Sequence, residues 1–250
     1  MRNIKITIEY DGTNFHGWQI QAKGHRTVQG EIRQALKKIF KRDTIIIGSG
    51  RTDTGVHAVG QVANFKIQTS LPVEKIRDAL NGNLPEDIAI LKAEEVPGKF
   101  NAQFSAKRKT YRYALLNRRA RCVHNRLFCY HFNHKLNLAA MRKAARSLTG
   151  KKDFRSFTAT DSARGEKKND TVRTIHALKI NKKDDYIFID ITANGFLYKM
   201  VRNIVGALLE VGTGRLTPPA LKKILKARNR NLAPATAPAH GLCLLNVDYF

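Results

Sequence analysis

An arginine and an aspartate stand two residues apart in a glycine-rich segment, residues 48–58, with the sequence Gly-Ser-Gly-Arg-Thr-Asp-Thr-Gly-Val-His-Ala. Apolar runs at 44–47 and 59–67 flank this segment and predict a strand on either side. Residues two apart on an extended chain project to the same side, so we expect the Arg51 guanidinium to hold the Asp53 carboxylate ionised and oriented. The glycines indicate unusual backbone dihedrals or close approach by a partner. The segment is a candidate active-site loop.

The lone carboxylate of Asp53 limits the chemistry that this loop could perform. Without a neighbouring acid it cannot form the carboxylate pair of an ordinary glycosidase, and an ionised aspartate suits a nucleophile better than a general acid. A turn aspartate that binds backbone amides is an equally good interpretation of the residues alone. A phosphate cradle is disfavoured, because the dinucleotide pattern needs a glycine at position 53 and no Walker lysine follows.

Five potential zinc ligands lie within thirteen positions: Cys122, His124, Cys129, His131 and His134. Their spacings do not match a zinc knuckle or finger. Core cysteines and surface histidines are therefore the favoured interpretation. A catalytic cysteine is also unsupported, because no cysteine has the glycine-rich or helix-start setting that lowers a thiol pKa.

The charge balance is strongly basic. The 250 residues include 45 Lys and Arg against 20 Asp and Glu, a formal net charge of +25, and the pI is near 10.3. A polyanion is the expected partner, because basic residues release counterions from a phosphate backbone; a soluble basic protein without such a partner is the alternative. No apolar run approaches the ~20 residues of a membrane span, and no signal-peptide core follows Met1. The three cysteines favour a reducing compartment, so we expect a cytoplasmic protein.

Hydrophobic periodicity predicts an α+β protein whose two halves share an element order. The first half is predicted as β-α-β-β-α-β, with strands at 4–8, 44–48, 59–67 and 87–96 and helices at 27–40 and 71–80. The second is predicted as β-α-β-β-α-α-β, with strands at 108–116, 172–180, 186–192 and 241–250 and helices at 137–148, at 200–209 and after 217–219. This duplication predicts two ferredoxin-like halves, 1–105 with the candidate loop and 106–250, whose antiparallel sheets carry helices on one face and form a central cleft.

The segment 159–170 is long, polar and basic, with Arg164, Lys167 and Lys168. Its composition favours a mobile lid or a phosphate-contacting loop. A solvated surface loop is the alternative.

The segment 48–58 resembles the active-site signature of the tRNA pseudouridine synthase I family, also called TruA. Other segments resemble that family's motifs in the same order: 9–12 with 17–19, 27–29, 100–106, 109–113, 153–157, 171–175, 196–206 and 237–244. The resemblance covers essentially the whole chain, and it implies the pseudouridine synthase fold.

The resemblance implies isomerisation of uridine to pseudouridine at positions 38, 39 and 40 of the tRNA anticodon stem-loop. Asp53 matches the family's catalytic aspartate, which attacks the nucleoside, either at the sugar C1′ or by promoting a glycal-type elimination. Tyr111 matches a tyrosine that packs on the target base, and Arg51 would pair with Asp53 and help to hold the place of the extruded nucleotide. Arg202 matches an arginine near the aspartate, and Leu244 matches an apolar residue of the uracil pocket. The family implies a homodimer that binds tRNA and needs no cofactor or metal.

The residues themselves agree with these roles in part. Arg202 interrupts an otherwise apolar helix, and a buried arginine needs an anionic partner, for which Asp53 or a phosphate is the natural candidate. Tyr111 alone would be interpreted as a half-buried strand aromatic. Gln103 stands where the family block 100–106 is expected to have arginine, which puts one RNA or pocket contact in doubt. Two alternatives stay open: a non-catalytic RNA-binding protein on the same fold, and a synthase with a different RNA target.

Overall fold

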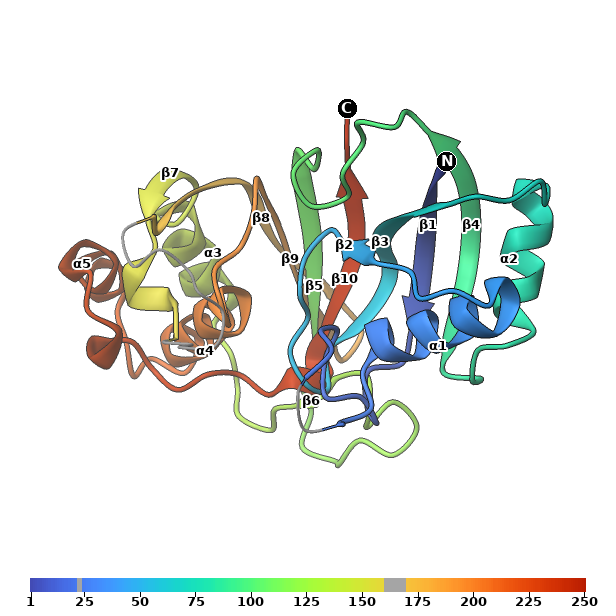
Figure 1. Cartoon of the computed structure of the whole chain (residues 1–250). Helices are drawn as coiled ribbons and strands as arrows, with labels where there is room; N and C mark the ends of the chain where they lie inside the picture. The colour runs from blue at the N-terminus through green and yellow to red at the C-terminus, as the bar shows by residue number, and fades with distance from the viewer. Residues whose placement is uncertain (22–23, 160–169) are drawn as a thin grey trace. The chain divides into compact units, whose positions relative to one another are not determined.

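The computed structural model describes residues 1–21, 24–159 and 170–250, so most of the predicted lid at 159–170 lies outside the described residues. The chain forms two compact units (Figure 1). The first unit comprises Met1–Lys107 and Cys243–Phe250, and the second comprises Arg108–Leu242. The predicted second half runs from 106 to 250, whereas the structure places the last strand in the first unit. The reason is a strand pairing with no local sequence signal: Cys243 and Leu244 pair with His57 and Ala58.

The first unit has the predicted β-α-β-β-α-β order with one strand added. Its elements are β1 (Arg2–Tyr10), α1 (Val28–Phe40), β2 (Ile46–Gly48), β3 (His57–Ile67), α2 (Val73–Asn81), β4 (Ile88–Val96) and β10 (Leu242–Asp248). β1 pairs antiparallel with both β3 and β4, and β2 pairs antiparallel with β3. β10 runs parallel to β3, so the expectation of a wholly antiparallel sheet is wrong at this strand.

Alternation and capping explain the elements that support the loop. In β1, Ile4, Ile6 and Ile8 are fully buried and point to the core. Thr27 is the N-cap of α1, as predicted: its Oγ1 accepts a hydrogen bond from the Gly30 N–H (3.3 Å). One face of the helix is buried. Figure 1 shows α1 in front of the strands, and α2 contacts both α1 and β4. The candidate loop therefore joins two strands on a packed layer.

The second unit has an antiparallel sheet in the order β5-β9-β8-β7, and β6 pairs parallel with β5. Its elements are β5 (Arg108–Leu116), β6 (Tyr130–His131), α3 (Leu138–Arg146), β7 (Gly150–Asp153), β8 (Val172–Lys183), β9 (Tyr186–Ala193), α4 (Met200–Gly212) and α5 (Pro218–Ala227). The main strands and helices match the predicted order. The two short strands β6 and β7 were not predicted, because strands of two and four residues are too short to show an alternating hydrophobic pattern.

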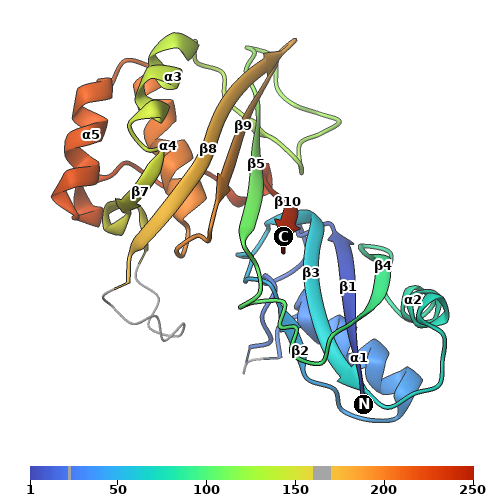
Figure 2. The same ribbon diagram turned by 90° about the horizontal axis from the view of Figure 1, so that it is seen from above.

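Three helices cover one side of β8 and β9 (Figure 2). α4 is the central one: 11 of its 13 residues are buried, as expected for a helix that is apolar on all sides. α3 packs against α4 and α5. Among the described residues, no helix is long and apolar enough to cross a bilayer.

Candidate active site

The candidate loop begins where β2 ends, and a buried glutamine holds it there. The Ser49 N–H donates to the Val62 carbonyl (2.7 Å), and the Ser49 hydroxyl donates to Gln61 Oε1 (2.7 Å). Gln61 Nε2 donates to the Gly50 carbonyl (3.0 Å). Gln61 is 0% exposed, so its buried amide holds the first residues of the loop against β3. Sequence reasoning missed it, although a glutamine inside the apolar run 59–67 was a signal.

Thr52, between the two candidate catalytic residues, is buried and bound through both side chain and backbone. Its hydroxyl lies 2.8 Å from the Tyr10 hydroxyl, and its carbonyl accepts a hydrogen bond from the backbone N–H of Trp18 (3.1 Å). Burial raises the pKa of Tyr10, so this phenol stays neutral and able to donate at physiological pH. Thr52 thus fastens the loop to β1 and to the motif at 17–19.

Asp53 is the first residue of a tight turn. Its carbonyl accepts the Val56 N–H (3.1 Å), and Gly55, the third residue of the turn, has φ +76°, as a type II turn requires. The Gly55 N–H donates to the Phe15 carbonyl (3.3 Å), which anchors the turn from outside. The turn is closed by backbone atoms and does not require the Asp53 carboxylate.

Arg51 and Asp53 both lie in the part of the chain that the structure describes, and the expected ion pair between them is not formed. Arg51 is exposed whereas Asp53 is half-buried. Residues 51–53 lie between β2 and β3 and belong to no strand, so the strand spacing that the expectation assumed does not apply to them. The glycines of the loop also allow close packing inside the protein, besides any close approach by a partner. Gly48 packs on the Trp18 indole, where a Cβ would come within 2.5 Å of Nε1.

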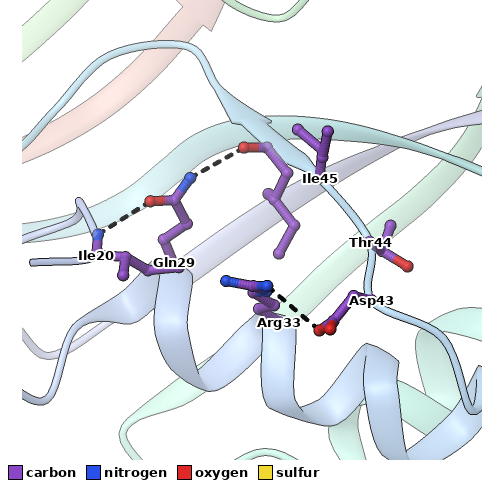
Figure 3. A pocket seen from close by; sticks show the side chains of 7 residues that line it. Ile20, Gln29, Arg33, Asp43, Thr44 and Ile45 are labelled. Atoms are coloured by element: carbon purple, nitrogen blue, oxygen red, sulfur yellow. Dashed lines mark hydrogen bonds and ion pairs between the residues drawn. The ribbon is translucent and has the colours of Figure 1, made fainter. Parts of the chain in front are cut away.

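Figure 3 shows how Gln29, in the motif segment 27–29, supports the strand that leads to the loop. Its Oε1 accepts the Ile20 N–H (3.0 Å) and its Nε2 donates to the Ile46 carbonyl (3.0 Å), so it joins the segment after Trp18 to β2. Gln29 also lines a pocket of about 220 Å³. The pocket is lined by Ile20, Gln29, Arg33, Asp43, Thr44, Ile45 and Ile46. No predicted site residue lines it.

Leu244 lies beside the strand that follows the loop. It pairs in parallel with Ala58 and its side chain is buried. The structure thus places Arg51, Asp53 and Leu244 in the first unit, and β10 brings Leu244 to the strand that carries the end of the signature segment. Tyr111 and Arg202 lie in the second unit.

Tyr111 is a buried residue of β5. Its ring packs edge-on against Phe196, with ring centroids 5.2 Å apart and an interplanar angle of 88°. Tyr113, on the same face of the strand, donates its hydroxyl to the Pro238 carbonyl (2.8 Å). Both aromatic side chains are therefore fixed by packing.

Arg202 lies in the first turn of α4 and exchanges hydrogen bonds with the chain beyond α5. Its Nε donates to the Ala237 carbonyl (2.8 Å), and the Ala237 N–H donates to the Arg202 carbonyl (3.2 Å). These bonds orient the guanidinium from the Nε side. The segment 233–237 also lies very close to the helix at Gly206, where a Cβ would meet the Ala235 carbonyl oxygen at 2.0 Å. Only glycine allows that approach.

Arg230 holds the same segment from the other end. One of its terminal nitrogens donates to the Ala233 and Pro234 carbonyls (2.8 and 3.1 Å), and the other donates to Asn203 Oδ1 (3.1 Å) and Thr236 Oγ1 (3.3 Å). Sequence reasoning did not identify this network, whose members are spread over three segments.

The cysteine and histidine cluster gives no metal site in the part of the chain that the structure describes: no group of three or more His, Cys, Asp or Glu side chains is arranged to hold an ion. The Cys122 and Cys129 Sγ atoms lie 3.5 Å apart as free thiols. Burial, with a contribution from Cys122, raises the pKa of the Cys129 thiol to about 12. This thiol is therefore protonated at neutral pH, which does not suit a nucleophile.

Lys109, two residues before Tyr111 on β5, is an unusual cation. Burial and, to a lesser extent, the positive charge of Arg173 lower the pKa of its amino group to about 8.

Comparison with known proteins identifies the family. The family model described as tRNA pseudouridine synthase matches residues 6–105 and 144–250. A protein named tRNA pseudouridine synthase A from Thermoanaerobacter sp. (strain X514) is 47% identical over 249 residues, covering 100% of both chains. Proteins of the same name from Caldicellulosiruptor saccharolyticus and Bacillus pumilus are both 46% identical and cover at least 98% of each chain.

The chain belongs to the tRNA pseudouridine synthase family. This membership confirms the resemblance drawn from residues 48–58 and from the motifs along the chain. The two α+β units described above agree with the fold predicted from it. Among solved structures, the crystal structure of a Cbf5-Nop10-Gar1 complex matches with a TM-score of 0.35 and 9% identity over 82% of this chain and 54% of that chain, a likeness too low to define a fold.

Replacing Gly55 should destabilise the turn that presents Asp53 in this pseudouridine synthase. Gly55→Ala forces an L side chain to φ +76° and should lower the free energy of unfolding by about 1–2 kcal/mol. Urea denaturation measures it. Gly98→Ala is the matched control, because a Cβ there meets nothing within 4 Å. Equal stability of the two variants would contradict the assigned turn.

The lowered pKa of Lys109 predicts a pH dependence of stability. Between about pH 8 and the ordinary lysine value of 10.5, the unfolded chain binds a proton that the folded chain does not, so stability should rise with pH across this window. The unfolding free energy of the wild type minus that of Lys109→Met should therefore be more positive at pH 9.5 than at pH 7. A difference that is constant with pH would show that Lys109 titrates normally.

Proposed function

We propose that this protein isomerises uridine to pseudouridine at positions 38, 39 and 40 of the tRNA anticodon stem-loop, with Asp53 as the nucleophile. The observation that carries the proposal is that hydrogen bonds to the protein core fix the turn that begins at Asp53. Within a tRNA pseudouridine synthase, the aspartate of the signature segment stands in a loop fixed by Thr52, Gln61 and Gly55. Catalytic groups need this preorganisation, because a misplaced nucleophile loses most of its effective concentration.

The reaction is an isomerisation, so its atoms balance without a second substrate. The target uridine leaves the base stack, which costs a few kcal/mol. Asp53 then attacks C1′ or promotes a glycal-type elimination, and the bond from C1′ to N1 of uracil breaks. The uracil turns and C5 bonds to C1′; the bond from Asp53 to C1′ breaks in the first route, and the C2′ proton taken by the elimination returns in the second. The C5 proton is then released, while N1 gains one. Both chemical routes share this balance.

The other predicted site residues support these steps. Tyr111, fixed by Phe196, packs on the target base and takes part in removing the C5 proton. Arg202, oriented by Ala237, acts on the aspartate or a phosphate of the substrate. Leu244 lines the uracil pocket. Arg51, which is exposed and does not pair with Asp53, holds the place of the extruded nucleotide in the RNA.

The charge distribution supports an RNA substrate. The second unit contains 29 Lys and Arg against 8 Asp and Glu, a formal charge of +21, whereas the first has 16 against 12, or +4. Neither α3 nor α5 contains an acidic residue. Five exposed cations on these two adjoining helices form no ion pair with any described residue: Lys143, Arg146, Lys222, Lys223 and Lys226. We assign phosphate contacts chiefly to the second unit.

The proposal includes a homodimer that acts in the cytoplasm, as the family resemblance implies. The three cysteines, all free thiols in the structure, are compatible with a reducing compartment.

Asp53→Asn decides the catalytic assignment. The wild type should release tritium from tRNA labelled at C5 of uridine, and the variant should release none above background, because an amide is a poor nucleophile. Sequence mapping of the modified tRNA should place pseudouridine at positions 38–40.

Three outcomes would separate the alternatives. No release by the wild type would favour a non-catalytic RNA-binding protein. Undiminished release by Asp53→Asn would remove the aspartate from the mechanism. Pseudouridine at other positions would leave the chemistry intact and overturn the assigned target. A tRNA-binding measurement on Asp53→Asn controls for loss of folding.

Charge reversal tests the phosphate contacts. The combined change of Lys222, Lys223 and Lys226 to Glu should weaken tRNA binding and reduce the slope of log Kd against log salt by about 2–3, since each phosphate contact contributes ~0.9. The matched control reverses Lys38, Lys41 and Arg42, three exposed cations of the first unit. Filter binding between 50 and 200 mM salt measures the slope. Equal loss in both variants would mean a diffuse charge effect.

A further inference from the structure

The segment 101–105 presents an exposed aromatic side chain on a firmly held turn. Asn101 Oδ1 accepts the N–H groups of Gln103 and Phe104 (2.9 and 3.1 Å), and the Ser105 N–H donates to the Asn101 carbonyl (2.9 Å). Such closely repeated bonds leave the turn little freedom. Phe104 stands at its tip and is 81% exposed.

The turn is fastened to the core of the first unit beneath Phe104. Ala102 is fully buried; its N–H donates to Asn64 Oδ1 on β3 (2.8 Å), and its carbonyl accepts the Tyr249 hydroxyl (2.8 Å). Phe100 packs on the same tyrosine, with ring centroids 4.9 Å apart. One phenylalanine of this block therefore serves the core, and the other is held out into solvent.

Exposure alone does not identify a function, because single apolar side chains are common on protein surfaces. Here it combines with charge. Lys99 and Lys107, on either side of the turn, are exposed and form no ion pair with any described residue. The sequence has no acidic residue between Glu95 and Asp153. Phe104 itself makes no ring contact within the described part of the chain.

We propose that Phe104 stacks on an unpaired base of the RNA substrate, with Lys99 and Lys107 at the adjoining phosphates. An aromatic face between cations is the chemistry by which proteins bind single-stranded nucleic acid. Extrusion of a target uridine unstacks its neighbours, and a rigidly held ring replaces the lost stacking without ordering a mobile segment. This inference rests on the proposed RNA substrate and adds a contact outside the predicted site residues.

The experiment compares three replacements that separate stacking from bulk. Phe104→Ala should raise KM for tRNA and weaken binding about 5- to 150-fold, the range for loss of one base–aromatic contact. Phe104→Leu, which keeps apolar volume without a π-face, should behave like Phe104→Ala. Phe104→Trp should retain wild-type KM. kcat and the thermal unfolding midpoint should stay unchanged in all three, because the side chain touches solvent rather than core.

Fluorescence reports stacking directly. The only native tryptophan, Trp18, is 1% exposed, so the indole introduced by Phe104→Trp supplies the accessible signal. Its emission should be quenched when tRNA is added, whereas wild-type emission should change little. Phe250→Ala, which removes another exposed aromatic ring, is the control and should bind tRNA normally.

Binding is also measured in the Asp53→Asn background, where loss of catalysis does not affect it, so this inference and the nucleophile assignment fail separately. Unchanged KM and Kd in Phe104→Ala overturn the proposal. So does full retention of affinity in Phe104→Leu, which would indicate apolar packing. A change in the oligomer mass of Phe104→Ala would assign the residue to contact with a second copy of the chain instead.

Discussion

The buried pair of hydroxyls, Thr52 on the loop and Tyr10 on β1, is the interaction on which the candidate site depends. The two oxygens lie 2.8 Å apart in the core, and the only other polar contact of the Tyr10 hydroxyl in the described residues is with Gln61 Nε2 at 3.5 Å. Moving the loop away would leave a buried hydroxyl with a weak partner, at a cost of about 1–3 kcal/mol. The position of Asp53, one residue later, is therefore determined by a strand more than forty positions earlier.

The same arrangement shows what local sequence patterns can and cannot predict. Alternation in β1 and helical spacing in α1 predicted the element order, and the caps at Thr27 and Asn137 were found where the side chains required them. The parallel pairing of β10 with β3 could not be predicted, because register between distant strands leaves no local periodicity. The expected ion pair of Arg51 with Asp53 is not formed between these two described residues, because the spacing rule holds for a strand and residues 51–53 lie between β2 and β3.

Charge and chemistry are divided between the two units. The first unit carries the nucleophile candidate with nearly balanced charge, which allows specific partners such as Arg26 with Asp87 (2.7 Å) and Lys5 with Glu94 (2.8 Å). The second has more than three cations per acid, so most of its cations must remain without an internal counterion. Mutual repulsion among them destabilises the folded state at low salt, and a polyanion relieves it. The charge excess of the second unit is therefore explained by binding to a polyanion rather than by the stability of the free protein.

Arg230 illustrates the same reasoning inside the fold. Desolvation lowers its pKa, yet an arginine stays charged in proteins, and none of its recorded partners is an acid: they are two carbonyls, an amide oxygen and a hydroxyl. Neutral acceptors compensate a half-buried charge less completely than a carboxylate would, so the arrangement is costly for stability alone. It does restrict the 233–237 segment to one path across Gly206, because both nitrogens must find their acceptors at once. That path ends at the Ala237 carbonyl, which orients Arg202.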